Sequence, residues 1–338
     1  MKASTLYLAE RRPRAAARTK RRRLVGAVLV ALIALSAVAY FHAGAMTRWA
    51  PEGEPTARPE DLSVLERARV LLTGVSIPRP VNHLTPEFVG LAYETYTFDN
   101  GHGDVLEAWH VPREGAAELA LLFHGYAGRK DGMLGVAEGF FDLGCAVSLV
   151  DFHGSGGSSG SGTELGMTEA ADVKAAVDDA HRRWPGLALV LYGQSMGGAS
   201  LLRAIAELGV EPAGIVVEST FDRLLSTVRC RFHRMGLPAT PFAELLVFWG
   251  SVRLGVNGFA HDPVEFARSV RCPALVLQGD RDPNVTTEQA RAIHASLGAW
   301  KRYSEYTKTG HQDVRTADRA RWTEDVSALL VEVRANTR

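Results

Sequence analysis

Short, uninterrupted apolar runs alternate with longer segments of helical periodicity through the C-terminal two thirds of this chain. A run of five or six apolar residues is too short for a typical helix and is typical of a strand that is buried on both faces. The runs are residues 119–123, 145–150, 187–192, 214–218 and 274–278, and the helical patterns occupy 132–143, 168–183, 195–208, 286–297 and 316–335. This alternation predicts an α/β fold with a mostly parallel central sheet and helices on both faces.

Two segments before the first apolar run have the alternation of strands with one solvated face. They are residues 92–98 and 105–111, and Asp99-Asn100-Gly101 between them is typical of a tight turn. Period-two alternation on both sides of such a turn predicts an antiparallel hairpin. We expect this hairpin to start the sheet.

The 18 residues from Leu24 to Phe41 carry no charge. At about 1.5 Å of rise per residue they would form roughly 27 Å of helix, just enough to cross a hydrocarbon core of about 30 Å. The basic residues before this segment are expected to stay on the cytoplasmic side, which predicts a single-pass membrane protein with its folded domain outside the cytoplasm. Cleavage near Ala45, after the small-residue sequence Ala43-Gly44-Ala45, is the alternative and would give a secreted or periplasmic protein.

Charge is divided unevenly between the N-terminus and the rest of the chain. Residues 1–23 hold nine Lys or Arg and one Glu, and the whole chain holds 38 basic and 38 acidic side chains, so 29 basic and 37 acidic side chains remain after residue 23. This acidic excess argues against nucleic acid as a partner. The three cysteines, Cys145, Cys230 and Cys272, form no pattern of a zinc site or a disulfide framework.

The sequence divides into a basic cytoplasmic tail (1–23), an anchor or signal segment (24–41), a linker with a lead-in helix (42–90) and one large domain (91–338). Within the linker, residues 46–60 contain three prolines and are expected to be a spacer. Residues 61–74 have helical apolar spacing, with Asp61 as the expected N-cap and Gly74 as the stop.

The strand at 187–192 leads into Gly193-Gln194-Ser195-Met196-Gly197, and a helical segment follows. Gly-x-Ser-x-Gly between a strand and a helix is the context of a nucleophile elbow. Glycines are needed there because the turn is sharp and the backbone of the serine is strained. The pattern predicts Ser195 as a catalytic nucleophile.

A nucleophilic serine requires a base, and the base requires a group that orients it. His311 follows the strand-like segment 300–306 in a loop and is the preferred base among the eleven histidines. Asp282 is preferred as the orienting acid, because it lies three residues beyond Gly279 and beside a proline that stiffens the turn. Asp280, which is expected to cap this loop, and Glu218, after the strand at 214–218, remain as alternatives.

The glycine-rich turn after residues 119–123 can present backbone N–H groups to a developing oxyanion. We predict Tyr126 and Met196 as the two N–H donors and a structural role for His124 in shaping this turn. Residues 151–160 are also rich in glycine, but they lack the lysine of a phosphate-binding loop and are expected to form the rim of the site.

The segments HGYAG, DFHGSGGSSG, GQSMGG, QGDRDPNV and GHQD, in this order and spacing, resemble the α/β-hydrolase superfamily. Within it the chain is similar to membrane-anchored or exported serine hydrolases of the serine aminopeptidase, lysophospholipase and BEM46-like kinds, over roughly residues 92–335. The resemblance implies a Ser195-Asp282-His311 triad with Tyr126 and Met196 as oxyanion donors. It also implies a cap over the site at residues 219–270, a segment rich in aromatic side chains that suit an apolar acyl group.

The expected activity is hydrolysis of carboxylic esters, including lipid or acyl esters, through an acyl-enzyme, and it requires no cofactor or metal. An exopeptidase or an acyltransferase would use the same residues, and a non-catalytic binding protein on the same scaffold is the alternative of another class. The expected partners are a small-molecule or lipid ester substrate and the membrane. The sequence does not indicate an oligomeric state.

Overall fold

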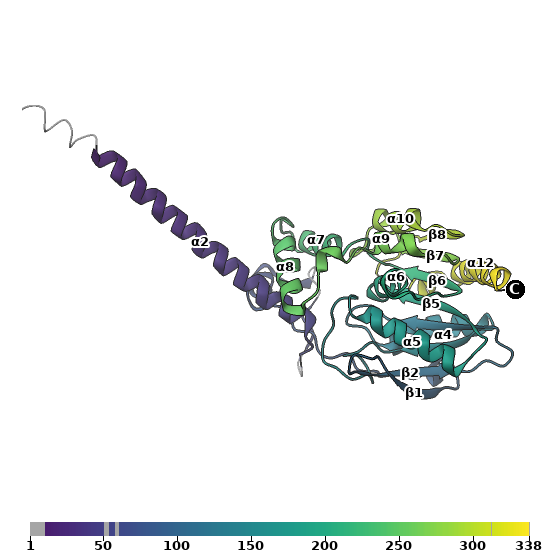
Figure 1. Ribbon diagram of the computed structural model, residues 1–338. Helices are drawn as coiled ribbons and strands as arrows, with labels where there is room; N and C mark the ends of the chain where they lie inside the picture. Colours follow the sequence, from purple (N-terminus) through teal and green to yellow (C-terminus); the bar gives the residue numbers. More distant parts are fainter. Residues whose placement is uncertain (1–10, 51–53, 58–60, 312, 338) are drawn as a thin grey trace, which may run out of the picture.

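The computed structural model describes residues 11–50, 54–57, 61–311 and 313–337. Its centre is an eight-stranded sheet with the order β1-β2-β4-β3-β5-β6-β7-β8 (Figure 1). The strands are β1 (Glu94–Asp99), β2 (Val105–Val111), β3 (Glu118–Phe123), β4 (Ala146–Val150), β5 (Ala188–Gln194), β6 (Gly214–Glu218), β7 (Ala274–Gly279) and β8 (Lys301–Tyr306). Strand β2 pairs antiparallel with both β1 and β4, and all other pairs are parallel. The predicted sheet and hairpin are confirmed.

Helices cover both faces of the sheet. Every residue of β3, β4, β6 and β7 is buried, as continuous apolar runs require. On one face lie α4 (Leu134–Asp142) and α12 (Arg319–Asn336), and on the other lie α5 (Glu169–Arg183), α6 (Met196–Leu208) and α10 (Thr287–Ser296). This two-sided covering leaves the ends of the parallel strands as the place for a ligand crevice.

The segment between β6 and β7 forms a small helical cap. It contains α7 (Leu224–Arg234), α8 (Phe242–Leu254) and the single-turn α9 (Pro263–Phe266). The apolar core of the cap includes Leu224, Val228 and Val247, and Ala43 and Met46 from the N-terminal helix are part of the same core. The cap is therefore built from two distant parts of the chain.

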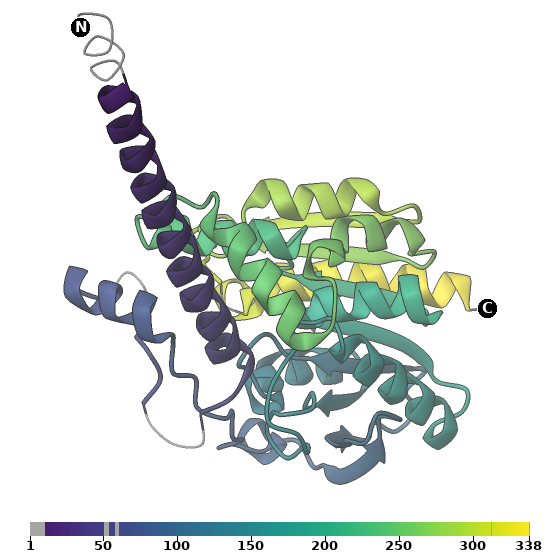
Figure 2. The same ribbon diagram turned by 60° about the vertical axis from the view of Figure 1, so that its left-hand side comes forward.

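The N-terminal helix α2 (Arg11–Thr47) projects far from the sheet, and its C-terminal end lies against the cap (Figures 1 and 2). Residues 20–47 are long and apolar enough to cross a membrane. At the docked end, the rings of Tyr40 and Trp249 meet edge to face with centroids 5.6 Å apart. The guanidinium of Arg253 lies 4.4 Å from the centre of the Tyr40 ring. The predicted anchor is thus one part of a helix that continues six residues past Phe41.

Two details of the linker differ from the sequence prediction. The spacer expected from residue 46 is ordered at its start, because Trp49 is buried and Ala50 donates to the carbonyl of Ile77 at 2.7 Å. Residues 51–53 and 58–60 lie outside the described part of the chain. The N-cap of the lead-in helix α3 (Val64–Thr73) is Ser63 rather than Asp61. Ser63 is the N-cap because it forms a capping box with Glu66, which satisfies two backbone N–H groups at once.

A buried lysine fixes the rim of the crevice beyond β4. The Lys130 ammonium is fully buried and lies 2.5 Å from Asp151 and 2.6 Å from Glu107. Asp151 also accepts hydrogen bonds from the Asn82 side chain at 2.7 Å and from the backbone N–H of Gly157 at 2.9 Å. These bonds tie the glycine-rich segment 151–160 to the sheet, which agrees with its predicted role as a rim loop.

Substitution Lys130→Met should destabilise the fold strongly, because it leaves the Asp151 carboxylate buried without its cation. We expect a loss of about 3–5 kcal/mol in the free energy of unfolding. Urea unfolding of the full chain in detergent micelles, followed by tryptophan fluorescence, measures this quantity. The control is Lys174→Met, which removes an exposed ion pair with Asp178 and should cost less than about 0.5 kcal/mol. Equal losses in the two variants would contradict the assignment.

Candidate active site

Ser195 lies in the sharp turn between β5 and α6, with φ of 52° and ψ of −112°. Positive φ is uncommon for a non-glycine residue and costs roughly 1–3 kcal/mol. A Cβ atom at Gly193 would lie 2.5 Å from the backbone of Gly197 and Gly198, and a Cβ atom at Gly197 would lie 2.4 Å from the carbonyl oxygen of Phe123. Only glycine at these positions lets the strand end, the turn and β3 approach this closely.

His311 and Asp282 form a hydrogen-bonded pair. Nδ1 of His311 lies 2.7 Å from Oδ2 of Asp282. The other carboxylate oxygen of Asp282 accepts backbone N–H groups of Asn284 at 2.8 Å and Val285 at 3.0 Å. The Asp282 side chain is fully buried, whereas a quarter of the His311 side chain is exposed. The carboxylate therefore has a fixed orientation, and it holds the imidazole at the surface of the crevice.

The two alternative acids lie elsewhere. Asp280 accepts the backbone N–H of Thr309 at 3.1 Å, which is a loop-capping role. Glu218 is fully buried and accepts hydrogen bonds from the hydroxyl of Tyr192 and from the amide of Gln194, the latter at 2.9 Å. Burial, and after it the nearby carboxyl of Asp313, raises the pKa of Glu218 to about 8. The structure places Asp282, and neither Asp280 nor Glu218, against His311.

The serine and the histidine–aspartate pair lie at the same edge of the sheet. Strands β5, β7 and β8 are parallel through their shared neighbours, so their carboxyl ends point the same way. Ser195 follows the end of β5, Asp282 the end of β7 and His311 the end of β8. A parallel α/β sheet binds ligands at this edge.

The loop after β3 lies against the Ser195 turn. A Cβ atom at Gly125 would lie 3.4 Å from the Cβ of Ser195, so the loop backbone passes close to the serine. Met196 is the first residue of α6, and its N–H therefore has no acceptor within the helix. Tyr126 follows Gly125, and Ala127 after it has a positive φ of 53°. The positions of Tyr126 and Met196 suit the predicted pair of oxyanion donors, a role that stays a prediction.

His124 shapes this loop, as predicted. Its Nδ1 lies 2.8 Å from the carbonyl oxygen of Gly125, and its Nε2 accepts the backbone N–H of Phe152 at 3.2 Å. Burial lowers the pKa of His124 below its ordinary value. The neutral ring can therefore donate at Nδ1 and accept at Nε2, which joins the ends of β3 and β4.

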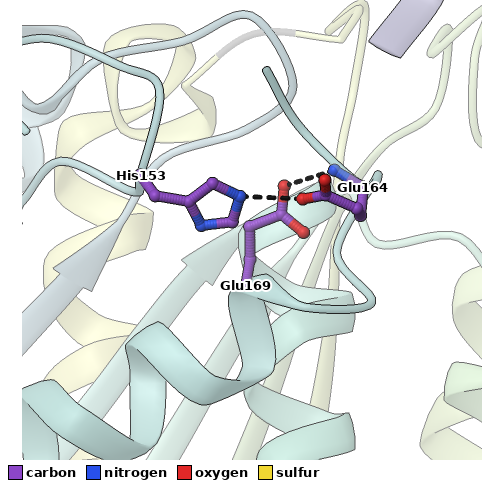
Figure 3. Close-up of side chains that lie close together, drawn as sticks. All are labelled: His153, Glu164 and Glu169. Atoms are coloured by element: carbon purple, nitrogen blue, oxygen red, sulfur yellow. Dashed lines mark hydrogen bonds and ion pairs between the residues drawn. The ribbon is translucent and has the colours of Figure 1, made fainter. Parts of the chain in front are cut away.

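His153 lies at the rim with both ring nitrogens against carboxylates. Nδ1 is 2.6 Å from Asp172 and Nε2 is 2.8 Å from Glu164, and Figure 3 shows Glu164 and Glu169 beside the ring. Donor atoms of His153, Glu164 and Glu169 lie within 4.8 Å of one another, the spacing of a metal site. Burial opposes protonation of the ring, but the hydrogen bonds to Asp172 and Glu164 outweigh it and raise the pKa of His153 to about 11. In the structure His153 therefore forms ion pairs with Asp172 and Glu164 that brace the rim.

One contact at the site was not predicted. The hydroxyl of Tyr126 donates to the carbonyl oxygen of Met46, near the end of α2, at 2.5 Å. Ala39, Ala43 and Met46 are buried and lie four and three residues apart on one face of α2. Small side chains at that spacing were the available signal that this end of the apolar segment packs on protein. Because the hydropathy is uniform along the segment, hydropathy alone does not distinguish the end that packs on protein.

Comparisons with known proteins bear on the fold and on sequence similarity. Residues 115–247 match the family model of serine aminopeptidase, S33. The membrane protein YNL320W of Saccharomyces cerevisiae is 30% identical over 145 residues, which are 41% of this chain and 50% of that protein. Protein bem46 of Schizosaccharomyces pombe is 23% identical, with 69% of this chain and 76% of that protein covered. Lysophosphatidylserine lipase ABHD12 of Macaca fascicularis is 22% identical, with 59% of this chain and 50% of that protein covered.

The match thus spans only half the length of the first and third of these relatives. Among solved structures, esterase Pf2001 of Pyrococcus furiosus superposes with a TM-score of 0.62 at 23% identity, covering 75% of this chain and 96% of that chain. Identity this low shows the fold alone. The mostly parallel sheet, the strained serine turn after β5 and these similarities together show that the chain has the α/β-hydrolase fold and is similar in sequence to serine hydrolases of that fold.

Proposed function

We propose that this chain is a serine hydrolase that cleaves carboxylic esters through a Ser195-His311-Asp282 triad. The observation that carries the proposal is the strained Ser195 turn at the same sheet edge as the 2.7 Å pair of His311 and Asp282. A lipase among the relatives and an esterase among the similar structures support an ester as the bond that is cleaved.

In the proposed mechanism the hydroxyl oxygen of Ser195 attacks the ester carbonyl carbon while Nε2 of His311 accepts the hydroxyl proton. Asp282 accepts the Nδ1–H bond and stabilises the imidazolium. The N–H groups of Tyr126 and Met196 bind the oxyanion, a contribution of about 3–4 kcal/mol per donor. The alcohol then leaves with the proton from His311. Water, deprotonated by His311, attacks the acyl-enzyme and releases the carboxylic acid, and Ser195 regains its proton.

The acidic side chains that could bind the amine of a peptide substrate already form ion pairs with arginines or are fully buried. Asp222 pairs with Arg223 at 3.0 Å, Glu244 with Arg229 at 2.5 Å and Glu265 with Arg268 at 2.9 Å. Glu218 is fully buried and, with its raised pKa, largely protonated at neutral pH. These engagements favour ester hydrolysis over exopeptidase activity. An acyltransferase would share the triad and differ in the acceptor that replaces water.

We further propose that α2 is retained as an uncleaved anchor that places the catalytic domain outside the cytoplasm. Cleavage near Ala45 would remove Ala39 and Ala43, which are both buried against the folded part, and would expose the cap core that Ala43 fills. The basic tract ahead of the apolar segment supports the orientation.

Substitution Ser195→Ala should abolish activity, because the variant has no nucleophile. We expect hydrolysis of p-nitrophenyl butyrate by the full chain to fall at least about 10³-fold and labelling by a fluorophosphonate probe to disappear. Ser200→Ala, a buried serine of α6 whose hydroxyl bonds to the Met196 carbonyl, is the control and should retain both signals. A folded parent chain that is neither labelled nor active would favour the non-catalytic binding protein.

The substitution Asp282→Asn tests which of the two aspartates of the β7 loop orients His311. Because the amide disfavours the productive tautomer of His311, we expect kcat to fall about 10⁴-fold with little change in stability. Asp280→Asn removes only a loop-capping acceptor and should change kcat less than about tenfold. Steady-state kinetics on p-nitrophenyl butyrate measure both variants. Equal losses in kcat would refute the assignment of Asp282 as the orienting acid.

The proposed orientation predicts the compartment of a reporter. Alkaline phosphatase fused after residue 50 should be active in a bacterial host, because it folds only where its disulfides form. A fusion after residue 20 should be inactive because its reporter stays in the cytoplasm. The gel mobility of the first fusion should match the full uncleaved length. The reverse pattern of activity would contradict the orientation, and a product shorter by about 45 residues would contradict the retained anchor.

A further inference from the structure

A cavity of about 490 Å³ lies between the membrane helix, α3 and the cap. Its walls are mostly apolar and include Leu35 and Val38 from α2, Leu71 and Leu72 from α3, and Phe232 and Leu246 from the cap. Figure 2 shows the arrangement, with α3 on one side of α2 and the cap helices on the other. A volume of this size is ordinary for a site that encloses a small molecule.

One end of the cavity reaches the oxyanion loop. Tyr126 and Ala127 form part of the wall, and Gly125 before them lies against Ser195. Met46, whose carbonyl accepts the Tyr126 hydroxyl, also belongs to the wall. A carbonyl group held at the predicted oxyanion donors would therefore lie beside this end of the cavity.

The opposite end follows α2 towards the membrane. From Met46 to Leu35 the cavity accompanies eleven residues of helix, which correspond to about 16 Å. The aromatic pair of Tyr40 and Trp249 lies beside this stretch, together with the exposed ring of Phe248, and such rings are typical of the membrane interface. The cavity therefore points towards the bilayer.

Helix α3 has apolar side chains on two sides. Val70, Leu71 and Leu72 line the cavity, whereas Val64 and Leu65 are more than 80% exposed. Beside a membrane-crossing helix, such outward apolar side chains are suited to lie in the membrane interface. This places α3 between the cavity and the bilayer surface.

Arg231 brings a positive charge to the wall of the cavity. It is half-buried on α7 and, among the residues that the structure describes, no carboxylate forms an ion pair with it. Other arginines of the cap, such as Arg223 and Arg229, are paired with acids. An unpaired guanidinium in an apolar wall next to the oxyanion loop is suited to bind an anionic group of a ligand.

We propose that this cavity is the acyl-chain subsite of the hydrolase and that it takes one long acyl chain of an anionic lipid ester directly from the bilayer. The proposal rests on the proposed ester hydrolysis at Ser195. The chain lies along α2, the ester carbonyl reaches the N–H groups of Tyr126 and Met196, and Arg231 binds the anionic headgroup. The membrane helix is then a wall of the substrate site as well as an anchor.

Filling the cavity should remove activity on long chains alone. Ala39→Trp and Val70→Trp insert an indole from two different walls, and their controls, Ala34→Trp and Val64→Trp, place it on exposed faces of the same helices. With the full chain in micelles, both cavity variants should lower kcat/KM for p-nitrophenyl palmitate at least about tenfold and that for the butyrate less than about threefold. The controls should match the parent. An unchanged palmitate-to-butyrate ratio in both cavity variants would overturn the proposal.

Arg231→Gln tests the anionic headgroup. Monopalmitoylglycerol and palmitoyl lysophosphatidic acid differ only by a phosphate, so they isolate the charge. We expect kcat/KM for the phosphorylated lipid to fall about tenfold and that for monopalmitoylglycerol to change less than about twofold. Arg229→Gln, on the same helix and paired with Glu244, is the control. Equal changes for the two lipids would exclude Arg231 as a headgroup ligand.

A binding measurement separates this proposal from the proposed function. In the full chain carrying Ser195→Ala, a fluorescent long-chain fatty acid should bind, and adding Ala39→Trp should weaken its binding at least about tenfold. Ester turnover that persists in Ser195→Ala would refute Ser195 as the nucleophile. The binding of the fatty acid would then still decide whether the cavity is an acyl-chain site. Binding that is indifferent to Ala39→Trp would refute the cavity as the acyl site even if Ser195 is the nucleophile.

Discussion

The close approach of three backbone segments at the end of β5 is the constraint on which the rest of the site depends. The left-handed conformation of Ser195 costs free energy, and tight packing of Gly193, Gly197 and Gly198 against neighbouring backbone maintains it. The same approach brings the loop after β3 beside the serine. A parallel sheet then carries the loops after β7 and β8 to the same edge, so the fold itself places the three proposed triad residues at one edge of the sheet.

Buried ionic groups hold the loops that surround this turn. Lys130 and Asp151 fix the start of the glycine-rich rim, and His153 between Asp172 and Glu164 fixes the next part of it. Removing one member of such a group leaves an uncompensated charge in a low-dielectric interior, which is why they are costly to disturb. The rim is therefore rigid without secondary structure of its own. It also reaches the nucleophile turn, because the hydroxyl of Thr163 lies 3.5 Å from the sulfur of Met196.

Most of the sheet could be predicted from the sequence, because a strand buried on both faces needs a continuous apolar run and few other elements produce one. Asp282, and not Asp280, contacts His311, and because both follow the same strand only the folded loop decides which of them does so; the role of Asp282 as the orienting acid stays a prediction. The N-cap of α3 was misplaced at Asp61, because Ser63 lies two residues further on and its capping box with Glu66 makes it the N-cap. The docking of α2 could not be predicted, because the hydropathy that indicates a membrane helix does not distinguish lipid from protein as its neighbour.

Because α2 packs against the cap, the N-terminal helix is more than a tether for the folded domain. A tether would need only length and hydrophobicity, and its last turns would be free of the domain. Here Ala43 and Met46 lie within the apolar core of the cap, Tyr126 of the loop after β3 donates to Met46, and Trp49 is buried beyond the helix end. The cap, α2 and the loop after β3 therefore form one packed unit. Because a packed unit transmits displacement rather than absorbing it, a displacement of α2 would reach the loop after β3 through the Met46–Tyr126 hydrogen bond and through the contact between the rings of Trp49 and Tyr126.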